Sequence, residues 1–239
     1  MNFAGSSPKE KRNKERFVKE AFSSIAKRYD LANTLLSLGI DSWWRKRARD
    51  ALGERPLVLD LCAGTLSMTR SYLDRWRGGR VIALDFSLDM LLPGRKRLKR
   101  REGRCSLVLG DALALPFPAG TFSGVMMAFG LRNLVDLQAG LAEIFRVLGE
   151  GGKAVILEFG HPTLPLFRQL YRLYLSRVIP SLGGWITGRR EVHHYLFRSI
   201  DSFPSREEIL GMMQKVGFKR LRASSLTLGI CVLYQGEKV

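Results

Sequence analysis

The sequence predicts an α/β domain built on a mostly parallel sheet. Short apolar runs alternate with helical stretches through the middle of the chain, and small-residue turns join many of them. Apolar residues make up 46% of the 239 residues, which is enough to bury one substantial core. Strands that alternate with crossover helices form a parallel sheet, with helices on both faces. The same composition favours a single domain.

The elements follow in order along the chain. A disordered basic tail is expected over 1–15, because its charged residues can bury little apolar surface. The single domain is then expected over 16–239. Phe17, Phe22 and Ile25 recur near helical spacing at its start, and a further helix opens near Asp41.

Five strands and three crossover helices are expected in the middle of the chain. The strands are placed at 57–62, 80–85, 105–109, 123–128 and 153–159, and the helices at 66–76, 87–100 and 136–148. Pro93 falls inside the second helix and is expected to kink it or to delay its start. Residues 160–204 are expected to form a lid insertion that holds helices of its own, followed by a helix at 206–216. Segments 218–225 and 229–235 alternate as a closing antiparallel pair.

The turn after the first strand favours an adenosyl cofactor. Ligands of open α/β sheets bind beyond the carboxyl ends of the strands, and this turn contains Gly64 but lacks the second glycine of a phosphate-binding loop. S-adenosylmethionine carries no phosphate. Asp85 ends the next strand about twenty residues later, the spacing at which a carboxylate reaches ribose hydroxyls. Gly64 and Asp85 are therefore candidate cofactor-binding residues, although Asp85 could equally be a helix cap.

Charge and cysteine content bound the environment. The formal net charge of +17 favours an anionic neighbour, either nucleic acid or the anionic face of a bilayer, or else a solvated basic surface. Three widely spaced cysteines suit a reducing cytoplasm, and Cys62 has no base at a spacing that would make it a nucleophile. No apolar run reaches the ~18 residues of a membrane span, and no signal-peptide core is present. Within the insertion, Phe167, Leu170, Tyr171, Tyr174 and Val178 predict an amphipathic helix with a basic face.

Several motifs resemble one family, the UbiE-type quinone C-methyltransferases of ubiquinone and menaquinone biosynthesis. They are Tyr29-Asp30-Leu31-Ala32-Asn33, Asp60 to Thr65, Gly110-Asp111-Ala112, Phe129-Gly130-Leu131-Arg132-Asn133 and Leu226-Thr227-Leu228-Gly229-Ile230. The resemblance implies the seven-stranded, Rossmann-like sheet of class I methyltransferases, which matches the strand count above. It also implies that Thr65, Asp85, Asp111 and Ala112 contact S-adenosylmethionine, Asp111 at the adenine edge and Ala112 through its backbone amide.

The chain departs from the family pattern at the cofactor turn and in the insertion. Leu66 and Ser67 stand where the family usually has Gly and Asp, so Leu66 is expected to add bulk where backbone approaches ligand. A positive φ at Leu66 would also be costly. In the insertion, His193 stands where a tyrosine is common.

The implied reaction is C-methylation of a quinol ring, either a demethylmenaquinol or a methoxy-polyprenyl-benzoquinol. It requires a base that removes a hydroxyl proton and so makes the ortho carbon nucleophilic. His193 is the first candidate because imidazole titrates near neutrality, with His194 and Tyr195 next, and Arg132 is expected to orient a water. Glu158 ends its strand at the crevice and is a candidate for holding substrate hydroxyls. Each of these side chains could instead be an ordinary packed or solvated residue, and no metal site is predicted.

A polyprenyl quinol substrate and an anionic membrane surface are the expected partners. The chain is expected in the cytoplasm, peripheral to the inner face of the cell membrane, and a homodimer is compatible with the sequence. Two other interpretations stay open. The charge permits a nucleic-acid methyltransferase, although the fourth strand does not end in an Asn-Pro-Pro-aromatic motif. Leu66 and Ser67 permit a non-catalytic homologue that binds the cofactor weakly within a quinone-synthesis complex.

Overall fold

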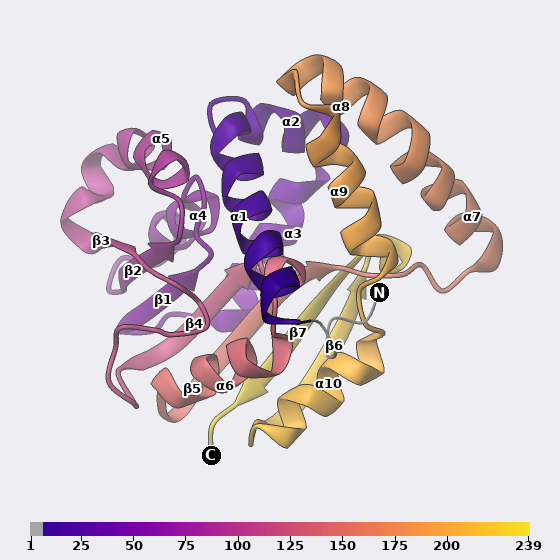
Figure 1. The fold of residues 1–239 in the computed structure, drawn as a ribbon. Helices are drawn as coiled ribbons and strands as arrows, with labels where there is room; N and C mark the ends of the chain where they lie inside the picture. Colours follow the sequence, from indigo (N-terminus) through magenta and orange to yellow (C-terminus); the bar gives the residue numbers. More distant parts are fainter. Residues whose placement is uncertain (1–6) are drawn as a thin grey trace.

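A seven-stranded sheet forms the centre of the computed structural model, which describes residues 7–239 (Figure 1). The strand order is β3-β2-β1-β4-β5-β7-β6. The strands are β1 Leu57–Leu61, β2 Arg80–Asp85, β3 Cys105–Leu109, β4 Phe122–Ala128, β5 Leu148–Phe159, β6 Lys219–Leu226 and β7 Cys231–Glu237. Strands β1 to β5 pair in parallel, and β7 is antiparallel to both β5 and β6. The predicted fold class and closing pair are confirmed.

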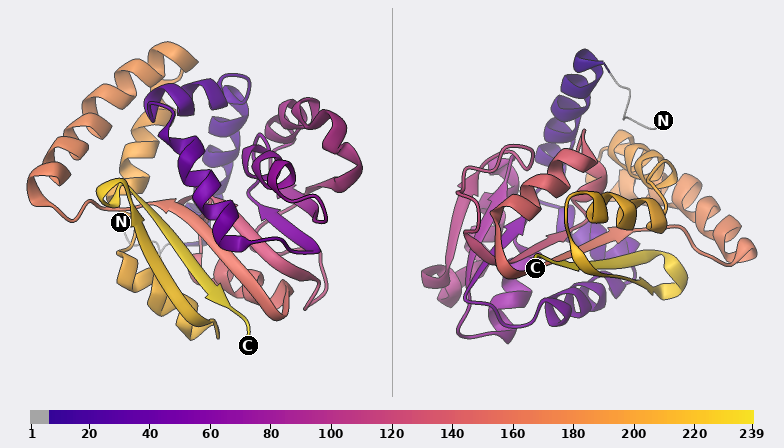
Figure 2. Two further views of the ribbon diagram at one scale, coloured as in Figure 1. Left: turned by 180° about the vertical axis from the view of Figure 1, so that it is seen from behind. Right: turned by 90° about the horizontal axis from the view of Figure 1, so that it is seen from below.

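The central strands β1 and β4 are apolar on both faces because helices cover both. Residues alternate in direction along β1, so Val58 packs on one face while Leu59 and Leu61 pack on the other. The face of Val58 is covered by α3 Ile40–Leu52, α4 Ser67–Arg75 and α5 Leu88–Leu98. The other face is covered by α6 Leu137–Val147 and α10 Arg206–Lys215 (Figure 2). The sheet order reverses between β1 and β4, which is where a ligand crevice is expected.

The remaining helices lie above the carboxyl edge of the parallel strands. They are α1 Pro8–Ile25, α2 Tyr29–Leu36, α7 Pro165–Leu173, α8 Ile179–Thr187 and α9 Arg190–Asp201 (Figure 1). A π-helical turn, η4 Tyr174–Val178, joins α7 to α8 without a break. Short 3₁₀ turns occur at η2 Lys99–Arg104, η3 Leu131–Asn133 and η5 Thr227–Gly229. The insertion expected at 160–204 therefore does contain helices.

Two boundary expectations are wrong. Helix α1 begins at Pro8, inside the tail expected to be disordered, because Ser7 and Glu10 form a capping box. Residues 1–6 of that expected tail lie outside the described residues. Strand β5 begins at Leu148, five residues earlier than expected, where the preceding helix gives way to pairing with Phe122.

Helix α5 begins at Leu88 with Pro93 inside it, so the proline does not delay its start. Proline removes the hydrogen bond to the carbonyl four residues earlier, which belongs to Asp89. Because Asp89 is exposed, water can replace that bond. Within the part of the chain that the structure describes, no helix is long and apolar enough to cross a membrane.

Candidate functional site

A cavity of ≈ 530 Å³ lies at the carboxyl ends of β1, β2 and β4. This volume is in the range of about 300–1,000 Å³ typical of ligand sites. Helix α1 closes one side of the cavity. Its wall includes four of the five predicted cofactor residues, Gly64, Asp85, Asp111 and Ala112. They lie at or just beyond the carboxyl ends of β1, β2 and β3, so the sheet topology brings them together.

Asp85 is the buried carboxylate of this cavity. Its Oδ2 accepts a hydrogen bond from the Gly64 amide at 2.8 Å, and its Oδ1 accepts one from the Ser87 amide at 2.9 Å. Burial raises the pKa of Asp85 to about 6, against the opposing effect of these backbone donors. The Phe86 amide is a third backbone donor, and a carboxylate has about four acceptor positions, so at least one remains for a ligand's hydroxyl.

Several residues with left-handed backbone surround the cavity. Gly64 has φ +53°, while Cys62 and Phe129, which follow β1 and β4 directly, have φ +55° and +62°. All three line the cavity. Left-handed conformations of residues with side chains cost free energy and cluster at functional sites. The geometry of both turns is therefore held by the surrounding structure rather than by local preference.

Thr65 is the predicted cofactor residue that does not line this cavity. Its hydroxyl donates to Asp30 Oδ1 at 2.5 Å, and Ser67 donates to the same oxygen at 3.3 Å. Arg97 forms an ion pair with the other oxygen of Asp30. Asp30 thus fixes the cofactor turn from helix α2. Sequence reasoning did not assign it this role, and its only signal was its place in the Tyr29-Asp30 motif.

Leu66 does not add bulk to the cavity, which corrects the expectation from the sequence. Its backbone is left-handed, with φ +63°, but its side chain is 1% exposed and packs in the core. A Cβ added at Gly94 would lie 2.6 Å from Leu66 Cγ and 2.7 Å from the Thr65 carbonyl oxygen. The absence of a side chain at Gly94 therefore leaves space for this turn. The leucine at 66, where the family usually has glycine, packs into that space beside helix α5.

We expect Leu66→Gly to lower the free energy of unfolding and to leave cofactor affinity nearly unchanged. Removing the strained left-handed leucine recovers about 1–2 kcal/mol, while losing its buried side chain costs about 2–5 kcal/mol. The net loss should be about 1–3 kcal/mol. Urea denaturation measures the stability, and calorimetric titration with S-adenosylhomocysteine measures the affinity. The double variant Leu66→Gly with Ser67→Asp, which carries the residues usual in the family, is measured beside it. A large gain in affinity in either variant would show that the natural turn is impaired.

A second cavity, of ≈ 200 Å³, lies beside the first and is enclosed mostly by aromatic and aliphatic side chains. It lies between α2, α3, the η4 turn and α9. Phe22, Tyr29 and Phe129 line both cavities, so they form a shared wall. A group bound in one cavity would therefore adjoin a group bound in the other.

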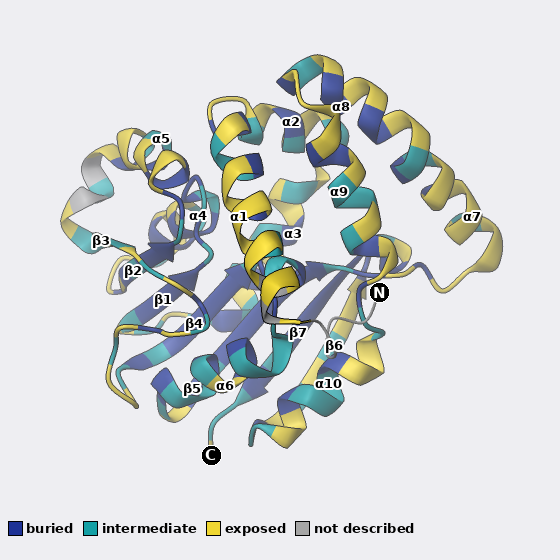
Figure 3. Cartoon of the chain, viewed as in Figure 1, coloured by how far each residue is buried: buried dark blue, intermediate teal, exposed yellow. Residues whose placement is uncertain are grey.

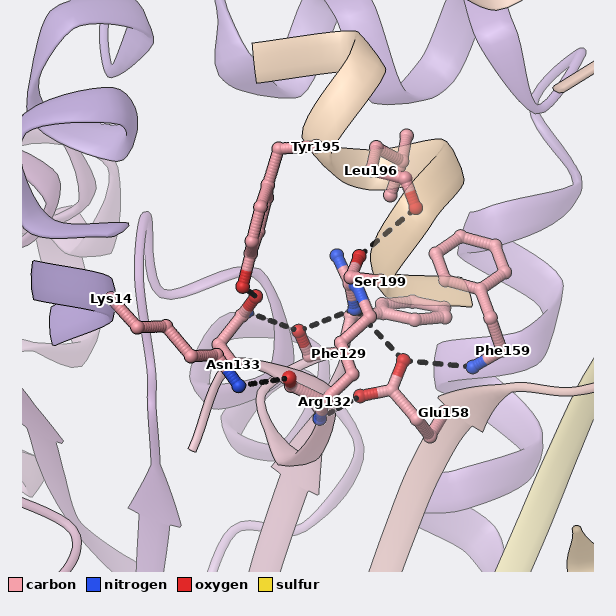
Figure 4. A network of polar contacts seen from close by, with 9 residues as sticks. All are labelled: Lys14, Phe129, Arg132, Asn133, Glu158, Phe159, Tyr195, Leu196 and Ser199. Atoms are coloured by element: carbon pink, nitrogen blue, oxygen red, sulfur yellow. Dashed lines mark hydrogen bonds and ion pairs between the residues drawn. The ribbon is translucent and has the colours of Figure 1, made fainter. Parts of the chain in front are cut away.

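A buried ion pair sits at the base of the second cavity (Figure 4). Arg132 donates from Nη1 to Glu158 Oε1 at 2.8 Å and to the Phe129 carbonyl at 2.7 Å. The Arg132 amide also donates to Glu158 Oε2 at 3.1 Å. Glu158, which was expected to hold substrate hydroxyls, lines neither cavity; it holds Arg132 instead.

Two other predicted catalytic residues line the second cavity. Tyr195 donates to Asn133 Oδ1 at 3.1 Å, and burial raises its pKa to about 12. His193 is buried against Gly183, with Nε2 at 3.1 Å from the Thr187 hydroxyl. Burial lowers the pKa of His193, so its imidazole is neutral at pH 7. His194 points elsewhere: it is exposed and does not line this cavity.

Four buried polar atoms in the wall of this cavity have no hydrogen-bond partner within the described chain. They are the Tyr171 hydroxyl, Arg132 Nε, His193 Nδ1 and Arg45 Nε. Sequence reasoning treated Tyr171 only as part of an amphipathic face. Because a buried polar group without a partner costs free energy, these four atoms indicate that the cavity receives a ligand with polar atoms.

Helix α1 is tied to this region by Lys14. Its Nζ donates to the Arg132 carbonyl at 3.3 Å (Figure 4). It also donates to the Leu134 carbonyl at 2.8 Å. Burial lowers the pKa of Lys14 to about 8. The N-terminal helix, unexpected over these residues, therefore closes the first cavity and braces the loop that carries Arg132.

The model of the ubiE/COQ5 methyltransferase family matches residues 9–238. The chain belongs to this family. It is 42% identical to a demethylmenaquinone methyltransferase of Thermus thermophilus, over 91% of this chain and 99% of that protein. It is also 42% identical to a ubiquinone/menaquinone biosynthesis C-methyltransferase of Geobacter sp., over 92% and 96% of the two chains.

Solved methyltransferases share the fold of this ubiE/COQ5 family member. A S-adenosylmethionine-dependent methyltransferase of Thermotoga maritima superposes with a TM-score of 0.65 at 18% identity, covering 92% of this chain and 99% of its own. Human N-acetylserotonin methyltransferase, in complex with S-adenosylmethionine, gives a TM-score of 0.60 at 15% identity, covering 88% and 55%. The chain is thus an S-adenosylmethionine-dependent methyltransferase.

The first cavity fits S-adenosylmethionine by its own chemistry. Asp85 keeps at least one acceptor position for the ribose, the backbone at Gly64 closes on the cavity, and Asp111 lies exposed at its rim. The individual contacts of Gly64, Thr65, Asp85, Asp111 and Ala112 with the cofactor stay predictions.

Proposed function

We propose that this enzyme methylates a ring carbon of a polyprenylated quinol, of the demethylmenaquinol or methoxy-polyprenyl-benzoquinol type. The observation that carries the proposal is the aromatic second cavity, which shares the wall of Phe22, Tyr29 and Phe129 with the cofactor cavity. An apolar ring fits its aromatic lining, and ring oxygens match the unpartnered Tyr171 and Arg132 atoms. The names of the Thermus and Geobacter relatives support the same class of substrate.

The residues of the second cavity have separate roles in this proposed reaction. S-adenosylmethionine, when bound, supplies an electrophilic methyl group. Arg132 stabilises the phenolate that forms when a ring hydroxyl loses its proton, because a fixed buried cation favours developing negative charge. His193, neutral at pH 7, is the proposed base, directly or through a water oriented by Arg132. Phe129 and Tyr29 position the ring against the shared wall and exclude water.

A labelling assay tests this proposal directly. Purified protein is incubated with methyl-labelled S-adenosylmethionine and two chemically reduced short-tail acceptors, a demethylnaphthoquinol and a methoxybenzoquinol. We expect label in the organic phase with one acceptor, which names the quinone class. Label in neither, beside an active family enzyme, would favour a different acceptor or the non-catalytic interpretation. Labelled RNA or DNA in a parallel reaction would instead favour nucleic-acid methylation.

We expect Tyr171→Phe to stabilise the ligand-free protein and to weaken the use of quinol. The variant removes a buried hydroxyl that has no partner, so the free energy of unfolding should rise by about 1 kcal/mol. The same change removes a donor to a ring oxygen, so KM for the acceptor should rise about tenfold. Thermal unfolding and steady-state kinetics measure both.

Tyr174→Phe is the matched control for this prediction. Tyr174 lines the same cavity, but its hydroxyl donates to the Leu36 carbonyl at 2.7 Å. Its loss should therefore lower stability by about 1 kcal/mol. If Tyr171→Phe destabilises the protein as Tyr174→Phe does and leaves KM unchanged, the Tyr171 hydroxyl has a structural role only.

We also propose that the enzyme works while bound peripherally to an anionic membrane surface. The net charge of +17 attracts anionic lipid, and a polyprenyl tail keeps the substrate in the bilayer. Vesicle flotation tests this, and binding that ignores lipid charge would contradict it.

A further inference from the structure

The insertion contains a helical rod that is apolar on two opposite faces. It runs without interruption through α7, η4 and α8 and lies outside the sheet (Figure 1). Its inner face buries Tyr171, Leu175 and Ile179 in the wall of the second cavity. Its outer face leaves large apolar side chains in solvent, namely Leu166, Leu170, Leu173, Leu182 and Trp185 (Figure 3). An apolar helix face normally packs against a partner, and the outer face of the rod has none within the described chain.

Helix α2 adds a second exposed stripe beside the rod. Leu31 and Leu35 are four residues apart, so they lie on one side of α2, and Leu38 follows in the turn after the helix. All three are exposed. Helix α2 packs along the rod, with Arg28 Nη1 bonded to the Ile186 carbonyl at 2.9 Å near one end. The Tyr174 hydroxyl meets the Leu36 carbonyl near the other.

Leu38 connects this exposed surface to the second cavity. It lines the cavity and is nevertheless 84% exposed, so it marks a mouth between the α2–α3 turn and the rod. A substrate with an apolar tail could enter there with the tail directed along the exposed stripe.

The charge of the rod indicates what covers its outer face. Residues 160–190 contain five arginines and no aspartate or glutamate. Arg168, Arg172 and Arg177 lie in the rod, Arg189 and Arg190 lie at the adjoining start of α9, and all five are exposed. Arg172 forms an ion pair with Asp201 at 2.9 Å. Apolar side chains between arginines on an amphipathic element are typical of helices that lie in an anionic membrane interface. A protein partner of the same extent would need a matching acidic rim.

We infer that α7, η4 and α8, with the exposed stripe of α2, form the face that docks on an anionic bilayer. Docking places the mouth at Leu38 against the lipid, so the tailed quinol reaches the second cavity without crossing water. The route of the quinol rests on the proposed function, because that function defines the substrate. The assignment of the lipid-binding face does not depend on it.

Co-sedimentation with vesicles tests the face independently of catalysis. The full chain is mixed with vesicles of equal parts phosphatidylglycerol and phosphatidylcholine, and with phosphatidylcholine vesicles. We expect binding to the first only. Leu166→Ser with Leu170→Ser should weaken it about tenfold. Leu92→Ser, which changes an exposed leucine on α5, should bind like the parent.

A second pair of variants tests the charge. Arg177→Gln with Arg189→Gln should weaken binding about 30-fold, because each basic residue near an anionic leaflet contributes about 1 kcal/mol. Lys215→Gln with Lys219→Gln carries the same change in net charge on α10 and β6 and should have little effect. Equal losses in both pairs would show that net charge alone drives binding and would overturn the assigned face. The absence of binding by the parent chain would overturn it as well, in favour of a protein partner.

Activity separates this inference from the proposed function. With a tailless quinol in solution, the Leu166→Ser/Leu170→Ser variant should keep the parent's rate; with a long-tail quinol in anionic vesicles, it should lose about tenfold. Equal rates on both substrates would overturn the docking role of the rod. If the parent methylates neither quinol yet binds vesicles through this face, the proposed function fails and the face stands.

Discussion

Replacing Glu158 by glutamine is expected to lower the free energy of unfolding by about 3–5 kcal/mol and to reduce turnover about 100-fold or more. Glu158 is fully buried, and Arg132 is 6% exposed, so the change leaves the guanidinium without a counter-charge in a dry site. It also disturbs the carboxylate that accepts the Arg132 and Phe159 amides. Chemical denaturation and quinol turnover measure the two losses.

A double variant separates stability from catalysis. Arg132→Met with Glu158→Leu removes both charges, and apolar replacement of a buried ion pair is often neutral or stabilising. We therefore expect most of the stability to return while turnover stays lost. Affinity for S-adenosylhomocysteine should be unchanged throughout, because neither residue lines the first cavity.

Glu237→Gln is the control for the loss of a carboxylate charge. Glu237 pairs with Arg220 near the surface at 2.9 Å, where an ion pair contributes less than about 1 kcal/mol. Recovery of normal turnover by the double variant would show that Arg132 takes no part in the reaction.

The sheet could be predicted from the sequence because each of its strands has a local sequence signal. The apolar runs from Leu57 and from Arg80 end in turns and alternate with helices, and that pattern permits few topologies. The charged residues at the start of α1 give no apolar signal, and the Ser7–Glu10 capping box is the local pattern that marks its first turn. The contact of Lys14 with the Arg132 loop is tertiary, so no local pattern predicts it.

The cofactor cavity was predicted better than the second cavity for a related reason. Gly64 lies in the turn after β1 and Asp85 ends β2, and because these two strands are adjacent and parallel, strand order alone brings the residues together. Tyr171 comes from the insertion, and nothing in its spacing tells which side of the helix faces the cavity. The direction of Leu66 was also beyond the sequence, since it depends on the space left by Gly94.

The affinity for the cofactor should decrease as the pH is lowered, because Asp85 becomes protonated. Its pKa is raised to about 6 by burial, and the proposed ribose contact requires the carboxylate. Protonation of a single essential group with that pKa weakens binding about tenfold between pH 7 and pH 5. S-adenosylhomocysteine has no group of its own that titrates strongly in this interval, so calorimetric titration at several pH values reports on the protein.

Asp85→Asn is expected to weaken the binding of S-adenosylhomocysteine about 100-fold at pH 7 and to remove this pH dependence. The asparagine keeps the size of the side chain but loses charged acceptors worth about 1.5–3 kcal/mol each. Asp89→Asn, an exposed change in the first turn of α5, is the control and should leave both affinity and its pH profile as in the parent. A parent profile that is flat from pH 7 to 5 would contradict the role of Asp85.

Stability should respond to pH in the opposite sense from affinity. Because the folded-state pKa of Asp85 lies above the unfolded value of 3.8, its contribution to stability is fully present below about pH 4 and is lost as pH rises through about 6. The ligand-free parent should therefore lose stability relative to Asp85→Asn over this interval, while its affinity for the cofactor rises. A carboxylate that lowers stability, yet is ionised at the pH at which the cofactor binds, behaves as a binding group. A helix cap would instead stabilise the fold. Measuring both profiles on the same two proteins distinguishes these roles.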